Sequence, residues 1–283
     1  MNKTNFLDSE NVKSFLAWLA CNFTTIEVRL NIKKSRFVPV LIQVQLTGVE
    51  TVLQYYQWKS VGMVKSDWSE AKVKLNELGA ALKMAKNDDQ ALSACKASLE
   101  WGGNRNWNVG AYPLLRDLAE ENQLCQYLKE SKKALALNKV GDYDFGCIKK
   151  MNSMLTKVHA LHSNDCLPIY DSRVAAAIAT LVEMWRISNN RETEPIPVEM
   201  SFPALDKKRT VGCAFPNAKE PEMLRYNKLN SNEWVSAKVR LGLLMQAFLE
   251  ENKTVFEHEK NRMHAFEACL FMLGYNPKCL TSL

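Results

Sequence analysis

Apolar residues recur along most of this chain at the three- and four-residue spacing of α-helices. From residue 67 onward this spacing predicts helices over Asp67–Lys86, Asp88–Trp101 and Leu114–Ala136, with a break near Asn122, and over Arg262–Leu273. A further helix is expected from the polar group at residues 231–233 to about residue 248, and another begins near residue 9. The glycines at 102–103 and 274 stand where helices end. The pattern therefore predicts a mainly α protein.

The N-terminal part differs, because it contains the best strand candidate of the chain. Residues Phe37–Leu46 alternate apolar and polar positions and are rich in β-branched side chains, and Thr25–Ile32 could pair with them. We therefore expect a single unit over 1–283, with 1–66 as an N-terminal α+β part and 67–283 as a helical part. Residues 189–222 are rich in proline and predict a long irregular loop.

The stretch Met151–Ala177 combines two helical patterns with a short polar break between them. An apolar face that includes Met151, Leu155 and Val158 surrounds one lysine, Lys157. An extended entry follows, and Asp171 then stands where the N-cap of a second helix is expected. This order predicts that a lysine and an aspartate lie near each other at a helix–turn–helix. Read by itself, the pattern describes a capping aspartate and an amphipathic lysine.

Composition narrows the picture only slightly. The chain has 283 residues, 47% of them hydrophobic, and a net charge of +6, which is compatible with a polyanionic partner but is spread along the chain. None of the eight cysteines forms a C-x-x-C pair, and no apolar run approaches the length of a membrane span. We therefore expect a reduced, soluble, cytoplasmic protein with no membrane partner. No phosphate-binding loop or dinucleotide fingerprint occurs, so we expect no cofactor.

The focal stretch resembles the helix-hairpin-helix DNA glycosylases, and the 8-oxoguanine DNA glycosylases most. Their hairpin reads L-x-G-V-G-x-K-V, and residues 151–158, MNSMLTKV, can be placed on it. Their aspartate segment reads V-P-V-D-x-H-V and is similar to residues 167–174, LPIYDSRV, which has one more residue before the aspartate. Both hairpin glycines are replaced, by Ser153 and Leu155. The resemblance implies a two-lobed helical array with a minor N-terminal β element.

The same resemblance implies an activity and a set of site residues. Lys157 would attack C1′ of a modified nucleotide, with or without a following lyase step, and Asp171 would stabilise the positive charge on the sugar. Duplex DNA with a modified base would be the partner. The DNA backbone or the orphan base would be contacted by Lys149, Lys150, Ser153, Thr156 and Arg173. The pocket for the flipped base would contain Tyr143 and Phe145.

Other hypotheses remain open at this point. The missing hairpin glycines favour a non-catalytic protein that reuses the glycosylase fold to bind nucleic acid or a protein, because glycine lets backbone amides approach a phosphate. A third possibility is a hydrolase of the glycosidic bond in free nucleosides or nucleotides. The spacing of His159, His162 and Cys166, with Cys147 nearby, could form a metal site, but it matches no usual zinc pattern, and no metal is expected.

Overall fold

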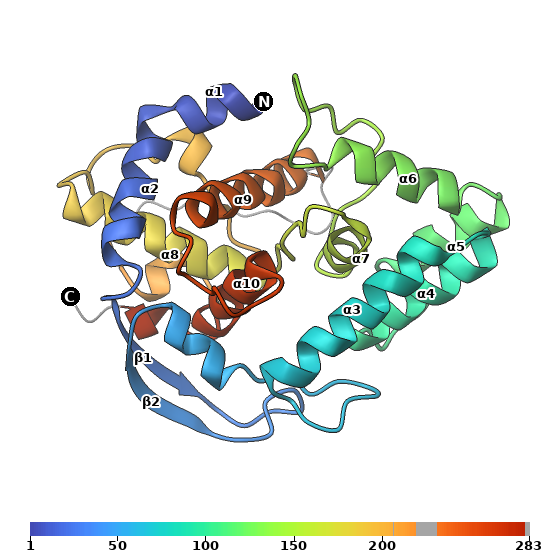
Figure 1. Cartoon of the computed structure of the whole chain (residues 1–283), viewed down its shortest axis with the longest axis horizontal. Coiled ribbons are helices and arrows are strands. Elements are labelled where there is room, and N and C mark those ends of the chain that lie inside the picture. The colour runs from blue at the N-terminus through green and yellow to red at the C-terminus, as the bar shows by residue number, and fades with distance from the viewer. Residues whose placement is uncertain (206, 219–230, 281–283) are drawn as a thin grey trace.

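The structure, a computed structural model, describes residues 1–205, 207–218 and 231–280, and these are mainly helical with one small sheet (Figure 1). The α-helices are α1 (Lys3–Asp8), α2 (Glu10–Asn22), α3 (Trp68–Met84), α4 (Asp88–Trp101), α5 (Tyr112–Glu120), α6 (Leu124–Ala134), α7 (Leu155–His162), α8 (Ser172–Ser188), α9 (Ser231–Glu251) and α10 (Arg262–Leu273). Short 3₁₀ helices are η1 (Glu50–Tyr55), η2 (Val198–Met200), η3 (Val211–Cys213) and η4 (Pro277–Leu280). The strands are β1 (Glu27–Ile32) and β2 (Ile42–Thr47).

The predicted N-terminal β element is confirmed as an antiparallel pair of strands. Its register runs from Glu27 opposite Thr47 to Ile32 opposite Ile42. Val28, Leu30 and Ile32 are buried while the alternate residues of β1 are exposed, as the period of two requires. The second strand begins later than predicted, at Ile42.

The predicted helix boundaries hold where a local signal sets them. Helix α10 spans the predicted Arg262–Leu273, and α4 spans the predicted Asp88–Trp101. Asn122 separates α5 from α6 with a φ of 56°, a left-handed conformation that ends a helix. Only the 3₁₀ helix η1 forms after Gly48. The additional helix α1 was not predicted.

The helices fall into two groups in Figure 1, and the focal stretch joins them. Helix α7 packs against α3, α4 and α6, whereas α8 packs against α2 and α10. Gly79 of α3 lies so close to α7 that a Cβ there would be 3.0 Å from the Leu161 carbonyl oxygen. The connection 163–171 therefore carries the chain from one group to the other. The N-terminal half of Met151–Val158 is not helical, since α7 begins at Leu155.

One hydrophobic core connects these elements. Phe23, just after α2, packs its ring against Phe248 of α9 and Phe266 of α10 at centroid distances of 4.8 and 5.1 Å. In the part of the chain that the structure describes, no helix has an apolar stretch that could cross a bilayer.

Candidate functional site

Lys157 lies in the first turn of α7 with its amine inside the protein. The Asn152 side chain begins this turn by accepting hydrogen bonds from the backbone N–H groups of Met154 and Leu155. The Lys157 side chain is only 6% exposed. Its Nζ donates to the Ser153 carbonyl oxygen at 2.7 Å. A Cβ on Gly102 would lie 2.6 Å from Lys157 Cδ, so the lysine stem rests directly against the end of α4.

Asp171 reaches the same place from the start of α8. The Tyr170 N–H donates to Thr156 Oγ1 at 3.0 Å, which holds the segment before α8 against α7. Asp171 Oδ1 accepts hydrogen bonds from the backbone N–H groups of Arg173 and Val174, as an N-cap does. Its Oδ2 lies 3.8 Å from Lys157 Nζ, and the side chain is 7% exposed. The structure thus brings the two predicted groups together as a buried ion pair.

Arg173 is held at this pair by aromatic rings. Its NH1 lies 3.9 Å from Asp171 Oδ2. Its guanidinium carbon lies 4.3, 4.9 and 5.8 Å from the ring centroids of Tyr275, Phe271 and Trp58. Such contacts stabilise a cation through the ring quadrupoles. Arg173 is therefore an interior cation with 17% of its side chain exposed, and the prediction that it contacts a phosphate or orphan base stays a prediction.

Two more ionisable groups are buried beside the pair, and the sequence analysis did not single them out. Lys238 of α9 is fully buried and donates to the Thr156 carbonyl and hydroxyl oxygens at 3.0 Å each. Glu267 of α10 accepts a hydrogen bond from the Ile169 N–H at 3.4 Å. Each is a charged residue within an apolar helical pattern, and this contrast is the sequence signal that could have identified them as buried. What they contact could not be read from the sequence, because the partners lie on other elements.

Burial sets the protonation of this cluster. Loss of water around the amine lowers the pKa of Lys157, and the nearby Asp171 carboxylate opposes that shift. Burial likewise lowers the pKa of Lys238 to about 7. Burial, together with the charge of Asp171, raises the pKa of Glu267 to about 8. Burial thus favours the neutral forms of Lys238 and Glu267 near neutral pH, and it shifts Lys157 in the direction that a nucleophilic lysine requires.

Several predicted DNA contacts lie in other environments. Lys149 is exposed, and Lys150 donates to the Gly110 carbonyl oxygen at 3.2 Å. The Ser153 carbonyl oxygen holds the Lys157 amine. Thr156 is completely buried and its hydroxyl is bonded to Tyr170 and Lys238, and its predicted contact with DNA stays a prediction.

The predicted base pocket is not part of this cluster. The Tyr143 N–H donates to the Met1 carbonyl oxygen and its hydroxyl to the Ala136 carbonyl oxygen, and Phe145 packs against Tyr143 with ring centroids 5.7 Å apart. These contacts place both rings beside the N-terminus. The rings that surround the cluster are Trp58, Phe271 and Tyr275 instead.

The histidine His159 of the focal stretch is packed in the protein interior. His159 is buried, its Nε2 lies 3.4 Å from the Tyr127 hydroxyl oxygen, and burial lowers its pKa to about 3. In residues 1–205, 207–218 and 231–280, no three histidine, cysteine, aspartate or glutamate side chains are grouped as metal ligands.

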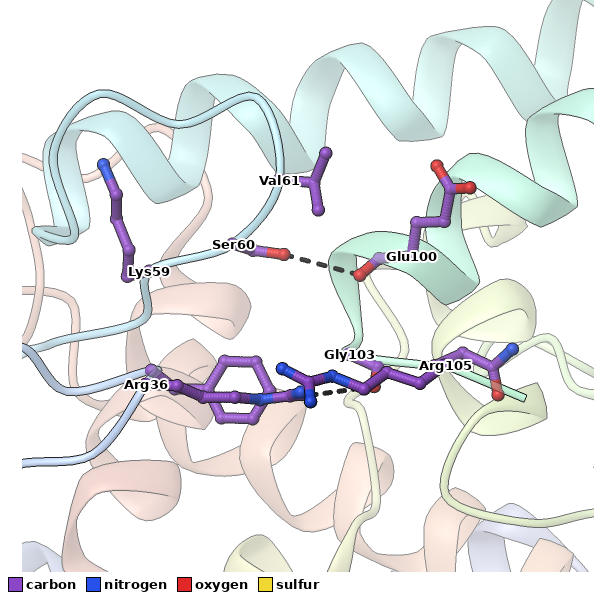
Figure 2. A pocket seen from close by; sticks show the side chains of 9 residues that line it. Arg36, Lys59, Ser60, Val61, Glu100, Gly103 and Arg105 are labelled. Atoms are coloured by element: carbon purple, nitrogen blue, oxygen red, sulfur yellow. Dashed lines mark hydrogen bonds between the residues drawn. The ribbon is translucent and has the colours of Figure 1, made fainter. Parts of the chain in front are cut away.

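A surface cavity of about 350 Å³ lies at the C-terminal end of α4 (Figure 2). Gly103, the residue after Gly102, lines it together with Arg36, Lys59, Glu100 and Arg105. Lys157 and Asp171 are not among its lining residues.

Comparison of the chain with protein-family models, curated proteins and solved structures finds no match.

Proposed function

We propose that the protein is a DNA glycosylase with an accompanying lyase step, built as a two-lobed helical array of the helix-hairpin-helix glycosylase type. The observation that carries the proposal is the buried Lys157–Asp171 pair, with Nζ and Oδ2 3.8 Å apart. Support comes from its place in the fold, where α7 of one helical group meets α8 of the other. Perturbed amines beside an ionised carboxylate are typical of catalytic sites.

The proposed chemistry uses each group in one role. The neutral Lys157 amine forms a bond to C1′, while the C1′–N bond breaks and its electron pair leaves with the base, which takes up a proton. The Asp171 carboxylate stabilises the positive charge that develops on the sugar. One proton then passes from the lysine nitrogen to O4′ as the C1′–O4′ bond breaks, which opens the sugar ring and gives an iminium, from which strand cleavage by elimination follows.

Access to the pair is part of the proposal. Because the two side chains are only 6% and 7% exposed, a nucleotide can reach Lys157 only if the surrounding wall opens. Closure of this wall over the bound nucleotide would then exclude water from the reaction.

Borohydride trapping tests the proposal. Duplexes that carry a panel of modified bases and an abasic site are incubated with wild type, Lys157→Gln and Lys133→Gln, an exposed lysine of α6. We expect a covalent adduct with wild type and Lys133→Gln and none with Lys157→Gln, whose folding is checked by circular dichroism. Absence of an adduct and of strand cleavage across the whole panel would contradict catalysis.

A second candidate is a non-catalytic nucleic-acid-binding protein. The observation in its favour is the altered hairpin: Thr156 is buried and the Ser153 carbonyl oxygen is bonded to Lys157, so these residues serve the interior. Duplex binding that weakens with salt but yields no adduct would support this candidate. A hydrolase of free nucleosides would need no phosphate contacts and would show no such salt dependence.

A further inference from the structure

The cavity shown in Figure 2 has the charge of an anion site. Three cationic side chains, Arg36, Lys59 and Arg105, line it, against one carboxylate, Glu100. Figure 2 shows the Glu100 side chain extending away from Arg36 and Arg105. Both arginines are exposed, so a ligand can reach them from solvent.

Arg36 is held in place by its neighbours, and this arrangement prevents a nucleic-acid base from stacking in the cavity. Its guanidinium carbon lies 4.0 Å from the Phe37 ring centroid, and its NH2 donates to the Gly103 carbonyl oxygen at 3.0 Å. The Phe37 ring also stacks on Trp58, with centroids 4.0 Å apart and planes at 10°. Arg36 and Trp58 must cover opposite faces of the ring, because both lie too close to share one. Phe37 therefore has no face left on which a base could stack.

Arg105 is the cationic side chain of the cavity that is available to pair with an anion. Within the described residues its guanidinium has no hydrogen-bond or ion-pair partner. The Lys59 amine, by contrast, already donates to the Met63 and Val64 carbonyl oxygens in its own turn. A planar guanidinium offers paired N–H donors that match the oxygens of a phosphate. The cavity is thus suited to a phosphate held between Arg36 and Arg105.

The position of the cavity connects it to the buried pair. Gly103 lines the cavity, and the adjacent Gly102 contacts the stem of Lys157. On the second side, Trp58 stacks on Phe37 and also lies 5.8 Å from the Arg173 guanidinium carbon. A group bound in the cavity would therefore lie next to the wall that separates Lys157 from solvent.

We propose that this cavity binds a backbone phosphodiester of the DNA strand that carries the target nucleotide, through Arg36 and Arg105. The inference rests on the proposed function for its partner and adds the place where the strand is held. A phosphate anchored here would position the strand beside the wall that must open over Lys157.

Salt-dependent binding tests this assignment without relying on catalysis. Affinity for a duplex with a tetrahydrofuran abasic analogue is measured by fluorescence anisotropy from about 50 to 200 mM salt, for wild type, Arg36→Gln, Arg105→Gln and Lys34→Gln. Lys34 is exposed, lies in the same loop as Arg36 and does not line the cavity. We expect each arginine variant to bind about tenfold more weakly or worse and to reduce the salt slope by about 1, with Lys34→Gln close to wild type.

The outcomes separate this inference from the proposed function. Unchanged affinity and slope in both arginine variants would overturn the cavity assignment, even if wild type still forms an adduct. Reduced slopes in a protein that forms no adduct would support the cavity as a phosphate site while contradicting the enzyme. If wild type shows no salt-dependent binding to DNA, both proposals fail.

Discussion

At the scale of single residues, the main feature is that four ionisable side chains are buried where α7 meets the start of α8. Lys157, Asp171, Lys238 and Glu267 have side chains that are almost removed from solvent. Each ionised form there loses its hydration, so the group either finds a partner or becomes neutral. Asp171 finds the N-terminus of α8, which stabilises a carboxylate through its N–H groups and dipole.

Glu267 makes stability depend on pH. Its pKa is raised from 4.5 to about 8, so between these values the native state binds a proton that the unfolded state releases. Stability from this residue is therefore fully present below about pH 4.5 and is lost as pH rises toward 8. In Glu267→Gln that loss should disappear, a difference of up to about 2 kcal/mol between pH 5 and 7. Urea unfolding of both proteins across this range measures it, and parallel pH curves would contradict the prediction.

Thr156→Val should destabilise the junction of α7 with the segment before α8. The hydroxyl oxygen accepts from the Tyr170 N–H and the Lys238 amine, and valine would leave both donors buried without it. We expect a loss of about 1–3 kcal/mol. Thr180→Val is the matched control, because its equally buried hydroxyl only donates to the Ala176 carbonyl oxygen four residues earlier. Equal losses in the two variants, measured by urea unfolding, would argue against a special role for Thr156.

At the scale of elements, local signals predicted most of the helices but not how their ends meet. Asp171 caps α8 as expected, and Asp67 caps α3, since an N-cap depends on neighbouring residues alone. Asn87 caps α4, whereas Asp88 accepts hydrogen bonds from the N–H groups of Leu124 and Cys125 at the start of α6. A cap supplied from another helix leaves no local signature.

The packing of α10 against the start of α8 leaves no room at Gly274. A Cβ there would lie 1.9 Å from the Arg173 carbonyl oxygen, which is backbone and cannot turn aside. Gly274→Ala should therefore force the two helix ends apart and cost about 2 kcal/mol or more. Gly146→Ala serves as control, since a Cβ there would meet only the Asp144 side chain at 3.2 Å. Thermal unfolding measures both, and a Gly274→Ala midpoint equal to that of the control would show that the ends can part freely.

At the scale of the whole molecule, the N-terminal α+β part and the helical part share one core. The Phe23 ring, which follows α2, contacts Phe248 of α9, Phe256 of the turn after it and Phe266 of α10 at centroid distances of 4.8, 6.0 and 5.1 Å. The sequence places Phe248 and Phe266 on apolar helix faces. It could not show that the faces meet, because contact between distant segments depends on the complete fold. The same reason hid Trp58 and Phe271 beside Arg173.

This shared core predicts that Phe23→Ala destabilises the entire chain rather than its N-terminal part alone. Truncating a buried phenylalanine typically costs about 3–5 kcal/mol. We expect near- and far-ultraviolet circular dichroism to report one transition at a lower temperature. The control is Val64→Ala, whose side chain is exposed. An early transition confined to part of the signal would show that residues 1–66 unfold independently.

The contact between Gly102 and the Lys157 stem has a consequence for natural variation. A Cβ at position 102 would occupy space that the lysine methylenes fill. A version of this protein that has lost the amine at 157 would no longer need a glycine at 102, whereas one that keeps the amine would. Sequences of relatives should therefore change at these two positions together, and that covariation would distinguish lineages that retain the buried amine from those that have lost it.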